Sequence, residues 1–191
     1  MRGLLFDGWQ LDGPALVLEY AQISQFEDIL VQRFGGGEPP FSVGVGGFTS
    51  ATEFRDCNIN WNESPSLIAN VTDVRWRGGA VQTLWGNDKA RSGLRFTGAV
   101  HAPFPDPRNS IGGPLKIEDV HQEGSNIWID GVQKVSLSGG FRVAGNVYIT
   151  NSTIGTLQDD GYDHNSSIYL EGRTLNDIRS VVAGSMTYAS P

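Results

Sequence analysis

Two acidic segments of the chain contain the residue types that acid–base chemistry needs. The first spans seven residues, 158–164, and offers Asp159, Asp160, Asp163 and His164. The second holds Asp119, His121 and Glu123 at alternate positions, which would place them on one face of a β-strand. Glycosidases hold two carboxylates about 5 to 9.5 Å apart. Either segment is therefore a candidate catalytic site, although a solvent-exposed turn is the simpler interpretation of the first.

A third group of residues could bind a carbohydrate. Trp128, Tyr148 and Tyr169 recur at intervals of 20 and 21 residues, and an acidic or hydroxyl residue follows each two positions later: Asp130, Thr150 and Glu171. Exposed aromatic rings can stack on the apolar faces of sugars, and carboxylates accept hydrogen bonds from sugar hydroxyls. The same pattern is also typical of a subunit interface, or of rings that stabilise neighbouring strands, and we favour that use over sugar binding.

The sequence offers no pattern for a metal or a cofactor. The three histidines are scattered, Cys57 is the single cysteine, and no carboxylate set has the spacing of a calcium-binding loop. The chain also lacks a phosphate-binding loop and a Gly-x-Ser-x-Gly nucleophile motif. We therefore expect neither metal nor cofactor, and we expect Cys57 to be a small buried residue.

Charge and hydropathy exclude further classes of partner. The net charge is -7, with 14 basic and 21 acidic residues, which argues against binding to nucleic acid. No apolar run approaches the roughly 18 residues of a membrane span, so we expect no membrane insertion. At 191 residues the chain suits one domain, and its 25 glycines favour turns over helices.

The elements that must position these candidates follow from an internal repeat. The segments Asn126–Asp130, Asn146–Thr150 and Ser167–Glu171 each alternate aliphatic and non-aliphatic residues, as β-strands do. Strands of hairpins would recur about every 8 to 12 residues. A spacing of 20 instead predicts parallel strands stacked in a coil, with Ile127, Val147 and Ile168 inward and the three aromatic residues outward.

Other segments fit the same coil less regularly. Strands are expected at Leu4–Phe6, Ala15–Tyr20, Ser92–Gly98 and Leu115–Glu118, whereas glycine and proline predict loops at 35–48 and 101–114. The segment Ser24–Phe34 also has helical spacing and a capping-box pattern. We favour a strand there because a strand pattern precedes it and three glycines follow.

With these strands laid out, the chain resembles the right-handed parallel β-helix of the pectate-lyase-like superfamily, and within it the β-helical regions of bacteriophage tail fibres and tailspikes. The segments that carry the resemblance are GSNIWIDG (124–131), GNVYITNST (145–153), SSIYLEG (166–172), FRDCNINW (54–61) and GPLKIEDVHQEG (113–124). The resemblance implies an all-β solenoid with about 20 to 25 residues per rung and a homotrimeric assembly. Residues 1–191 would form one β-helix domain or a piece of a longer fibre.

The resemblance also implies two alternative functions. In the first, the chain is a structural and receptor-binding part of a phage virion that recognises a cell-surface polysaccharide through Trp128, Asp130, Tyr148, Tyr169 and Glu171. In the second, it is a secreted polysaccharide-degrading enzyme, a hydrolase or lyase. Asp159 and Asp160 resemble the Asp-Asp step of polygalacturonases, but the chain lacks that family's Gly-His-Gly and Arg-Ile-Lys segments. We therefore favour the first.

Overall fold

The structure is a computed structural model. It describes residues 1–9, 11–83, 92–98, 114–132, 134–143, 145–152, 154–159, 167–171, 180–181 and 185–189. None of these residues lies in a helix, and they form two β-sheets. The expected all-β class is therefore confirmed.

Twelve strands belong to the first sheet: β1 (Arg2–Asp7), β4 (Gln25–Gln32), β7 (Thr52–Arg55), β8 (Asn58–Asn60), β10 (Val74–Arg77), β11 (Ala80–Gln82), β13 (Pro114–Glu118), β14 (His121–Glu123), β16 (Lys134–Ser138), β17 (Phe141–Val143), β19 (Ile154–Asp159) and β21 (Ser180–Val181). Ten belong to the second: β2 (Leu16–Leu18), β3 (Ala21–Gln22), β5 (Phe41–Val43), β6 (Thr49–Ser50), β9 (Ser66–Val71), β12 (Gly93–Gly98), β15 (Asn126–Asp130), β18 (Asn146–Thr150), β20 (Ser167–Glu171) and β22 (Ser185–Ala189).

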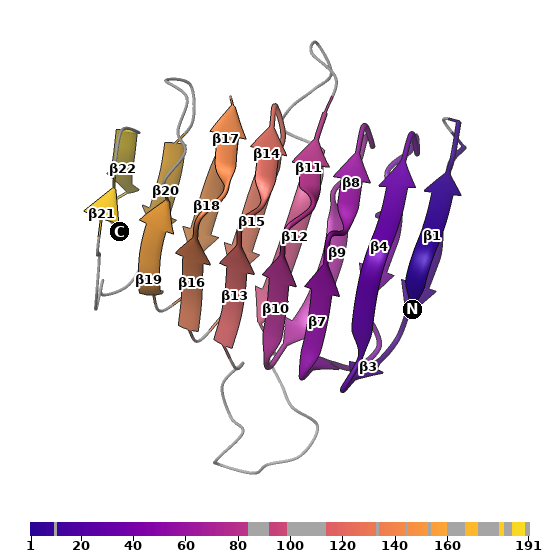
Figure 1. Cartoon of the computed structure of the whole chain (residues 1–191), viewed down its shortest axis with the longest axis horizontal. Coiled ribbons are helices and arrows are strands. Elements are labelled where there is room, and N and C mark those ends of the chain that lie inside the picture. The colour runs from indigo at the N-terminus through magenta and orange to yellow at the C-terminus, as the bar shows by residue number, and fades with distance from the viewer. Residues whose placement is uncertain are drawn as a thin grey trace.

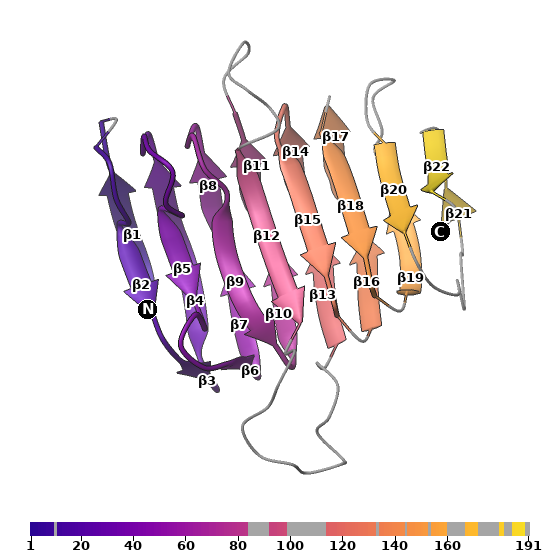
Figure 2. The same ribbon diagram turned by 180° about the vertical axis from the view of Figure 1, so that it is seen from behind.

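Every strand pairing among the described residues is parallel. The chain passes repeatedly from one sheet to the other: β7 and β8 of the first sheet are followed by β9 of the second, and likewise β10 and β11 by β12, β13 and β14 by β15, and β16 and β17 by β18. Figure 1 shows the first sheet in front, with its strands running across the long axis of the molecule. Figure 2 shows the second sheet from behind, and β1 and β22 lie at opposite ends of the molecule.

The first sheet bends where a residue takes a left-handed backbone conformation. The first half of β4 pairs with β7 and its second half with β8, and Asp28 lies between the halves at a φ of 54°. Further along the sheet the chain is divided at the same place into β7 and β8, β10 and β11, β13 and β14, and β16 and β17. The residues at these bends also have positive φ: Asp56, Gly78, Asp119 and Gly139. Asp and Gly tolerate this conformation better than other residues.

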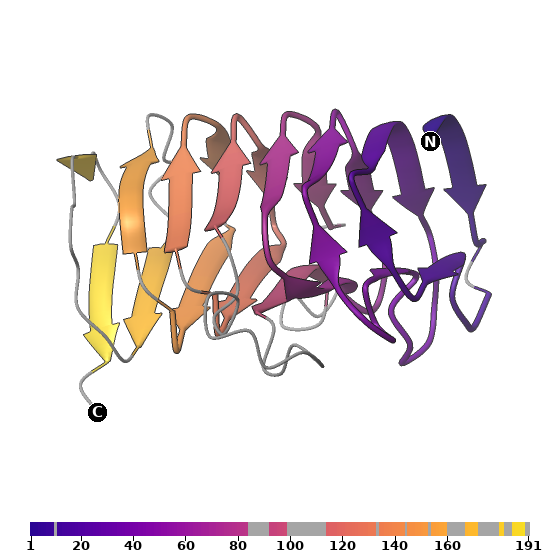
Figure 3. The same ribbon diagram turned by 90° about the horizontal axis from the view of Figure 1, so that it is seen from below.

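The core lies between the two layers seen edge-on in Figure 3. Its centre is an aromatic stack in which Phe54 lies 4.8 Å from Phe26 and 4.9 Å from Trp76, centroid to centroid, with nearly parallel planes. Phe41 and Phe96 approach this stack edge-on from the second sheet. All five rings are buried. Burying a large apolar side chain contributes about 1.5 to 3 kcal/mol, so the stack is a major part of the stability of this region.

The predicted register of the three repeated segments is confirmed. Ile127 pairs with Val147 and Val147 with Ile168, whereas Trp128, Tyr148 and Tyr169 are paired in the same way on the opposite face. The three aliphatic residues are buried. The strand that we favoured over a helix at Ser24–Phe34 is also observed, as β4.

The expectation of a loop over the whole of 35–48 is wrong, because β5 lies inside this range. Phe41 and Val43 are fully buried, and β5 pairs with both β2 and β9. The alternation of Phe41, Ser42 and Val43 fills one level of the core in spite of the glycines and prolines around it. The second predicted loop, 101–114, lies outside the described residues except for Pro114, which begins β13.

The β1 end of the molecule is less covered than its middle. Leu4 is paired with Ile29 in the register of β1 and β4, yet Leu4 is 37% exposed and Ile29 only 1%. On the second sheet, the inward residues Leu16 and Leu18 are only partly buried. Among the described strands β1 pairs with β4 alone. This end therefore presents apolar side chains and an unpaired strand edge.

Candidate functional site

The three outward aromatic residues form a ladder on the second sheet. Trp128, Tyr148 and Tyr169 lie side by side on β15, β18 and β20, and each is half-buried. The centroids of Trp128 and Tyr148 are 6.1 Å apart with 13° between the ring planes, and those of Tyr148 and Tyr169 are 4.8 Å apart with 7°. The guanidinium of Arg95 on β12 lies 5.5 Å from the Trp128 centroid. This aromatic ladder thus ends in a cation–π contact.

The stacking decides what the aromatic ladder can offer to a ligand. Because the ring planes are nearly parallel from strand to strand, the faces are turned toward one another, and the rings present mainly their edges to solvent. The Tyr148 hydroxyl also accepts a hydrogen bond from Asn146 Nδ2 at 3.4 Å. Stacked pairs of this kind stabilise neighbouring strands. A ligand would meet ring edges and polar groups more than open aromatic faces.

A polar row accompanies the aromatic ladder. Asp130 is exposed at the end of β15, and its Oδ1 accepts hydrogen bonds from Thr150 Oγ1 at 2.6 Å and from Asn151 Nδ2 at 2.9 Å. Its Oδ2 accepts none from the residues that the structure describes. Glu171 follows Thr150 in the strand register, but its side chain lies outside the described part of the chain. Asp130 therefore combines a link from the end of β15 to the end of β18 with one oxygen available to a ligand.

The structure separates Asp119 from the two residues predicted to share its strand face. Asp119 is an exposed residue in the bend between β13 and β14, with a φ of 55°, so it is not part of a strand. His121 and Glu123 do share a face of β14, with their Nε2 and Oε2 atoms 3.4 Å apart, and Gln82 Nε2 lies 3.4 Å from the same Glu123 oxygen. The predicted row of three is wrong because the left-handed bend interrupts the alternation at Asp119.

The other acidic candidate falls almost wholly outside the described residues. Asp159 is the last residue of β19 and its backbone pairs with Val181, but its side chain is not described. Asp160, Asp163 and His164 lie in the undescribed range 160–166. The proposed chemistry of this segment stays a prediction.

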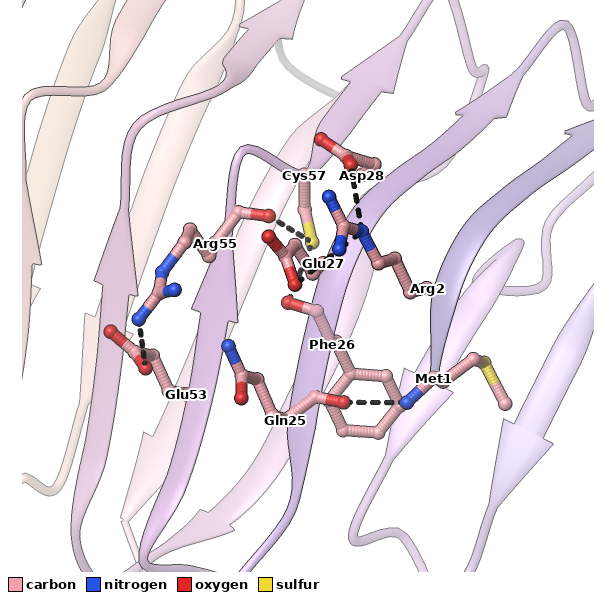
Figure 4. A network of polar contacts seen from close by, with 9 residues as sticks. All are labelled: Met1, Arg2, Gln25, Phe26, Glu27, Asp28, Glu53, Arg55 and Cys57. Atoms are coloured by element: carbon pink, nitrogen blue, oxygen red, sulfur yellow. Dashed lines mark hydrogen bonds and ion pairs between the residues drawn. The ribbon is translucent and has the colours of Figure 1, made fainter.

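Cys57 is the small buried residue that the sequence predicts. It is 2% exposed, and its Sγ atom lies 3.6 Å from the Phe26 carbonyl oxygen and 3.5 Å from that of Arg55. Figure 4 shows it near the ion pairs of Arg2 with Asp28, which is exposed, and of Arg55 with Glu53, which is partly buried. Burial raises the pKa of the thiol to about 11. The thiol is therefore protonated at neutral pH and unsuited to nucleophilic chemistry.

No group of three or more histidine, cysteine or acidic side chains within the described ranges could hold a metal ion. No helix of the described residues is long and apolar enough to cross a membrane.

One cluster was not predicted from the sequence. Trp9 follows β1, and the guanidinium carbon of Arg33 lies 4.0 Å from the centroid of its ring, while Arg33 is paired with Asp7. The Arg33 hydrogen bond holds the pKa of the Asp7 carboxyl below its ordinary value. The sequence signal was a tryptophan in a polar turn next to Asp7, but its partner Arg33 is 24 positions away and could be placed beside it only by pairing β1 with β4.

Comparisons of the chain with protein-family models, with curated proteins and with solved structures found no match.

Proposed function

We propose that this chain is a right-handed parallel β-helix with a structural and receptor-binding role of the kind found in bacteriophage tail fibres and tailspikes. Parallel pairing throughout the described strands, the alternation of the chain between two sheets and the 20- and 21-residue repeat all support a coil of stacked rungs. The chain would belong to a phage virion and form a homotrimer, as proteins with this architecture typically do.

The observation that carries the binding role is the aromatic ladder together with its polar row. Three half-exposed rings are aligned on successive strands, about 4.8 Å apart, and the Asp130 carboxylate lies on the same strand as Trp128. A polysaccharide lying along the long axis of the molecule could contact several ring edges at once, with sugar hydroxyls donating to Asp130 Oδ2. An aligned row of this kind suits an extended, repetitive ligand better than a small compact one.

The test is binding of the purified chain to an array of bacterial surface polysaccharides. We expect the wild-type chain to bind one class of glycan, and we expect Trp128→Ala and Tyr148→Ala each to reduce that binding by about tenfold, since aromatic contacts are worth about 0.5 to 1.5 kcal/mol each. Trp61→Ala is the matched control, because Trp61 is a partly exposed tryptophan away from this sheet. Equal binding by these two variants and the wild type would show that the aromatic ladder is not the glycan-binding site.

The enzymatic alternative receives no support from the described residues. Asp119 lies in the bend between β13 and β14 and not in the strand that carries His121 and Glu123. A depolymerase would release new reducing ends or unsaturated products from the polysaccharide that it binds, and this assay on the glycan identified by the array decides between the two functions.

A further inference from the structure

Trp9 is the most exposed large aromatic residue among those described, and it is held in place. It lies in the turn after β1 with 73% of its surface exposed. The Arg33 guanidinium covers one face of the ring at 4.0 Å. With that much of the residue exposed, the other face of the indole is open to solvent.

Arg33 is itself fixed by a network of hydrogen bonds. Its Nε donates to Asp7 Oδ1 at 2.9 Å, and its Nη2 pairs with Asp7 Oδ2. Asp7 also accepts from Gln32 Nε2 at 2.9 Å and from the backbone N–H of Trp9 at 3.4 Å. A carboxylate has about four lone-pair sites, so Asp7 is fully engaged and acts as a positioning residue. Three of the five N–H groups of Arg33 are not used by Asp7.

This arrangement differs from the aromatic ladder in the surface that it offers. In the ladder the ring faces are turned toward one another, whereas Trp9 presents one whole face while Arg33 is fixed against the other. A ligand that fits this surface has a flat apolar face that can stack on the indole. A pyranose ring has such a face. A nucleobase also stacks on tryptophan, but the net charge of -7 opposes the phosphates that would accompany it.

We propose that Trp9 is the platform of a second carbohydrate site, in which the outer face of the indole stacks on a pyranose ring while the Arg33 guanidinium holds the opposite face of the indole in place. Gln32 and Asp7 keep Arg33 in position and do not contact the sugar. The site lies at the β1 end of the molecule and shares no residue with the aromatic ladder (Figures 1 and 2). The proposal for Trp9 can therefore be tested independently of the aromatic ladder on the second sheet.

The experiment titrates a panel of methyl pyranosides, neutral and uronic, into the full chain and follows tryptophan fluorescence and calorimetric heat. We expect at least one pyranoside to bind. Trp9→Ala should weaken that binding by about tenfold or more, and Trp9→Tyr should retain most of it because a stacking face remains. Asp7→Asn should weaken binding without removing the platform, since it frees Arg33.

The controls separate this site from the ladder and from protein contacts. Trp128→Ala should bind the pyranoside like the wild type, and circular dichroism should show that every variant is folded. Failure of the whole panel to bind, or equal binding by Trp9→Ala and the wild type, would overturn the proposal. A lower solution mass for Trp9→Ala than for the wild type would overturn it too, because Trp9 would then lie at a contact between copies of the chain.

Discussion

At the scale of single residues, burial determines the chemistry of Cys57. Its thiol is enclosed between the bend of the first sheet and the core, and the desolvation of the thiolate raises its pKa to about 11 from an ordinary value of 9.0. The thiolate is the reactive form of cysteine. The burial of the thiol and its raised pKa therefore both act against chemical modification of Cys57 in the folded protein.

We predict that Cys57 reacts with a thiol reagent at neutral pH only after unfolding. The measurement compares the rate of Ellman's reaction in buffer and in denaturant, with free cysteine as the control. Because the folded pKa is raised, the neutral thiol contributes stability that is fully present below about pH 9 and is lost as the pH rises toward 11. Rapid labelling of the native chain at pH 7 would contradict this description of the residue.

Residue-level sites were the least predictable part of the molecule. The sequence indicated an aromatic strip at Trp128, Tyr148 and Tyr169, and their alignment is confirmed, but the way in which the rings stack on one another depends on side-chain orientation. The Trp9 cluster was missed because Arg33 reaches it only through the pairing of two strands. Asp119 was misplaced because an aspartate in a left-handed bend cannot be told from one in a strand by alternation alone.

At the scale of the strand and turn, two glycines with left-handed backbones differ in their surroundings: Gly79 lies between β10 and β11 of the first sheet, and Gly131 follows β15 of the second. Gly79 has a φ of 73°, and a Cβ atom there would lie 2.0 Å from the carbonyl oxygen of Cys57. Gly131 has a similar φ of 67°, but a Cβ there would have no neighbour closer than 3.9 Å. The two positions share the backbone strain and differ in the space available.

We predict that Gly79→Ala destabilises the protein more than Gly131→Ala does. Gly131→Ala should cost about 1 to 2 kcal/mol from the left-handed conformation alone. Gly79→Ala should cost a further 1 to 3 kcal/mol or so, because the neighbouring backbone must shift to accept the methyl group. Urea unfolding of the two variants measures the difference in the free energy of unfolding. Equal losses of stability would contradict the prediction, because they would show that the backbone at Cys57 moves away from Gly79 without cost.

Strands were predictable where the pattern repeats and unpredictable where it is interrupted. The segments at Asn126–Asp130, Asn146–Thr150 and Ser167–Glu171 fixed one another's register, because a shift by one residue would turn buried aliphatic residues outward. β5 was missed because three residues between a proline and a glycine carry too little pattern to be separated from a loop. The structure shows the strand through its contacts: Phe41 and Val43 are buried in the core, and β5 pairs with β2 and β9.

At the scale of the whole molecule, the proposed assembly can be measured directly. We predict a solution mass of three times the chain mass of 20.7 kDa by light scattering. Trp128→Ala and Tyr148→Ala should keep this mass if the aromatic ladder binds glycan. A monomeric wild type would contradict the trimer, and trimers that dissociate on these substitutions would assign the ladder to the subunit interface.

The direction of the strands has a mechanical consequence. Strands cross the long axis, so the hydrogen bonds between neighbouring strands run along it (Figure 1). A pull along the axis applies the same force to every pair of neighbouring strands. The molecule therefore opens first at its weakest pair, whatever the number of strands. If β15 and β18 separate, the 20 residues between their paired positions release about 70 Å of extended chain. Under tension the molecule would therefore lengthen in steps, because each pair of strands that separates releases a further length of extended chain.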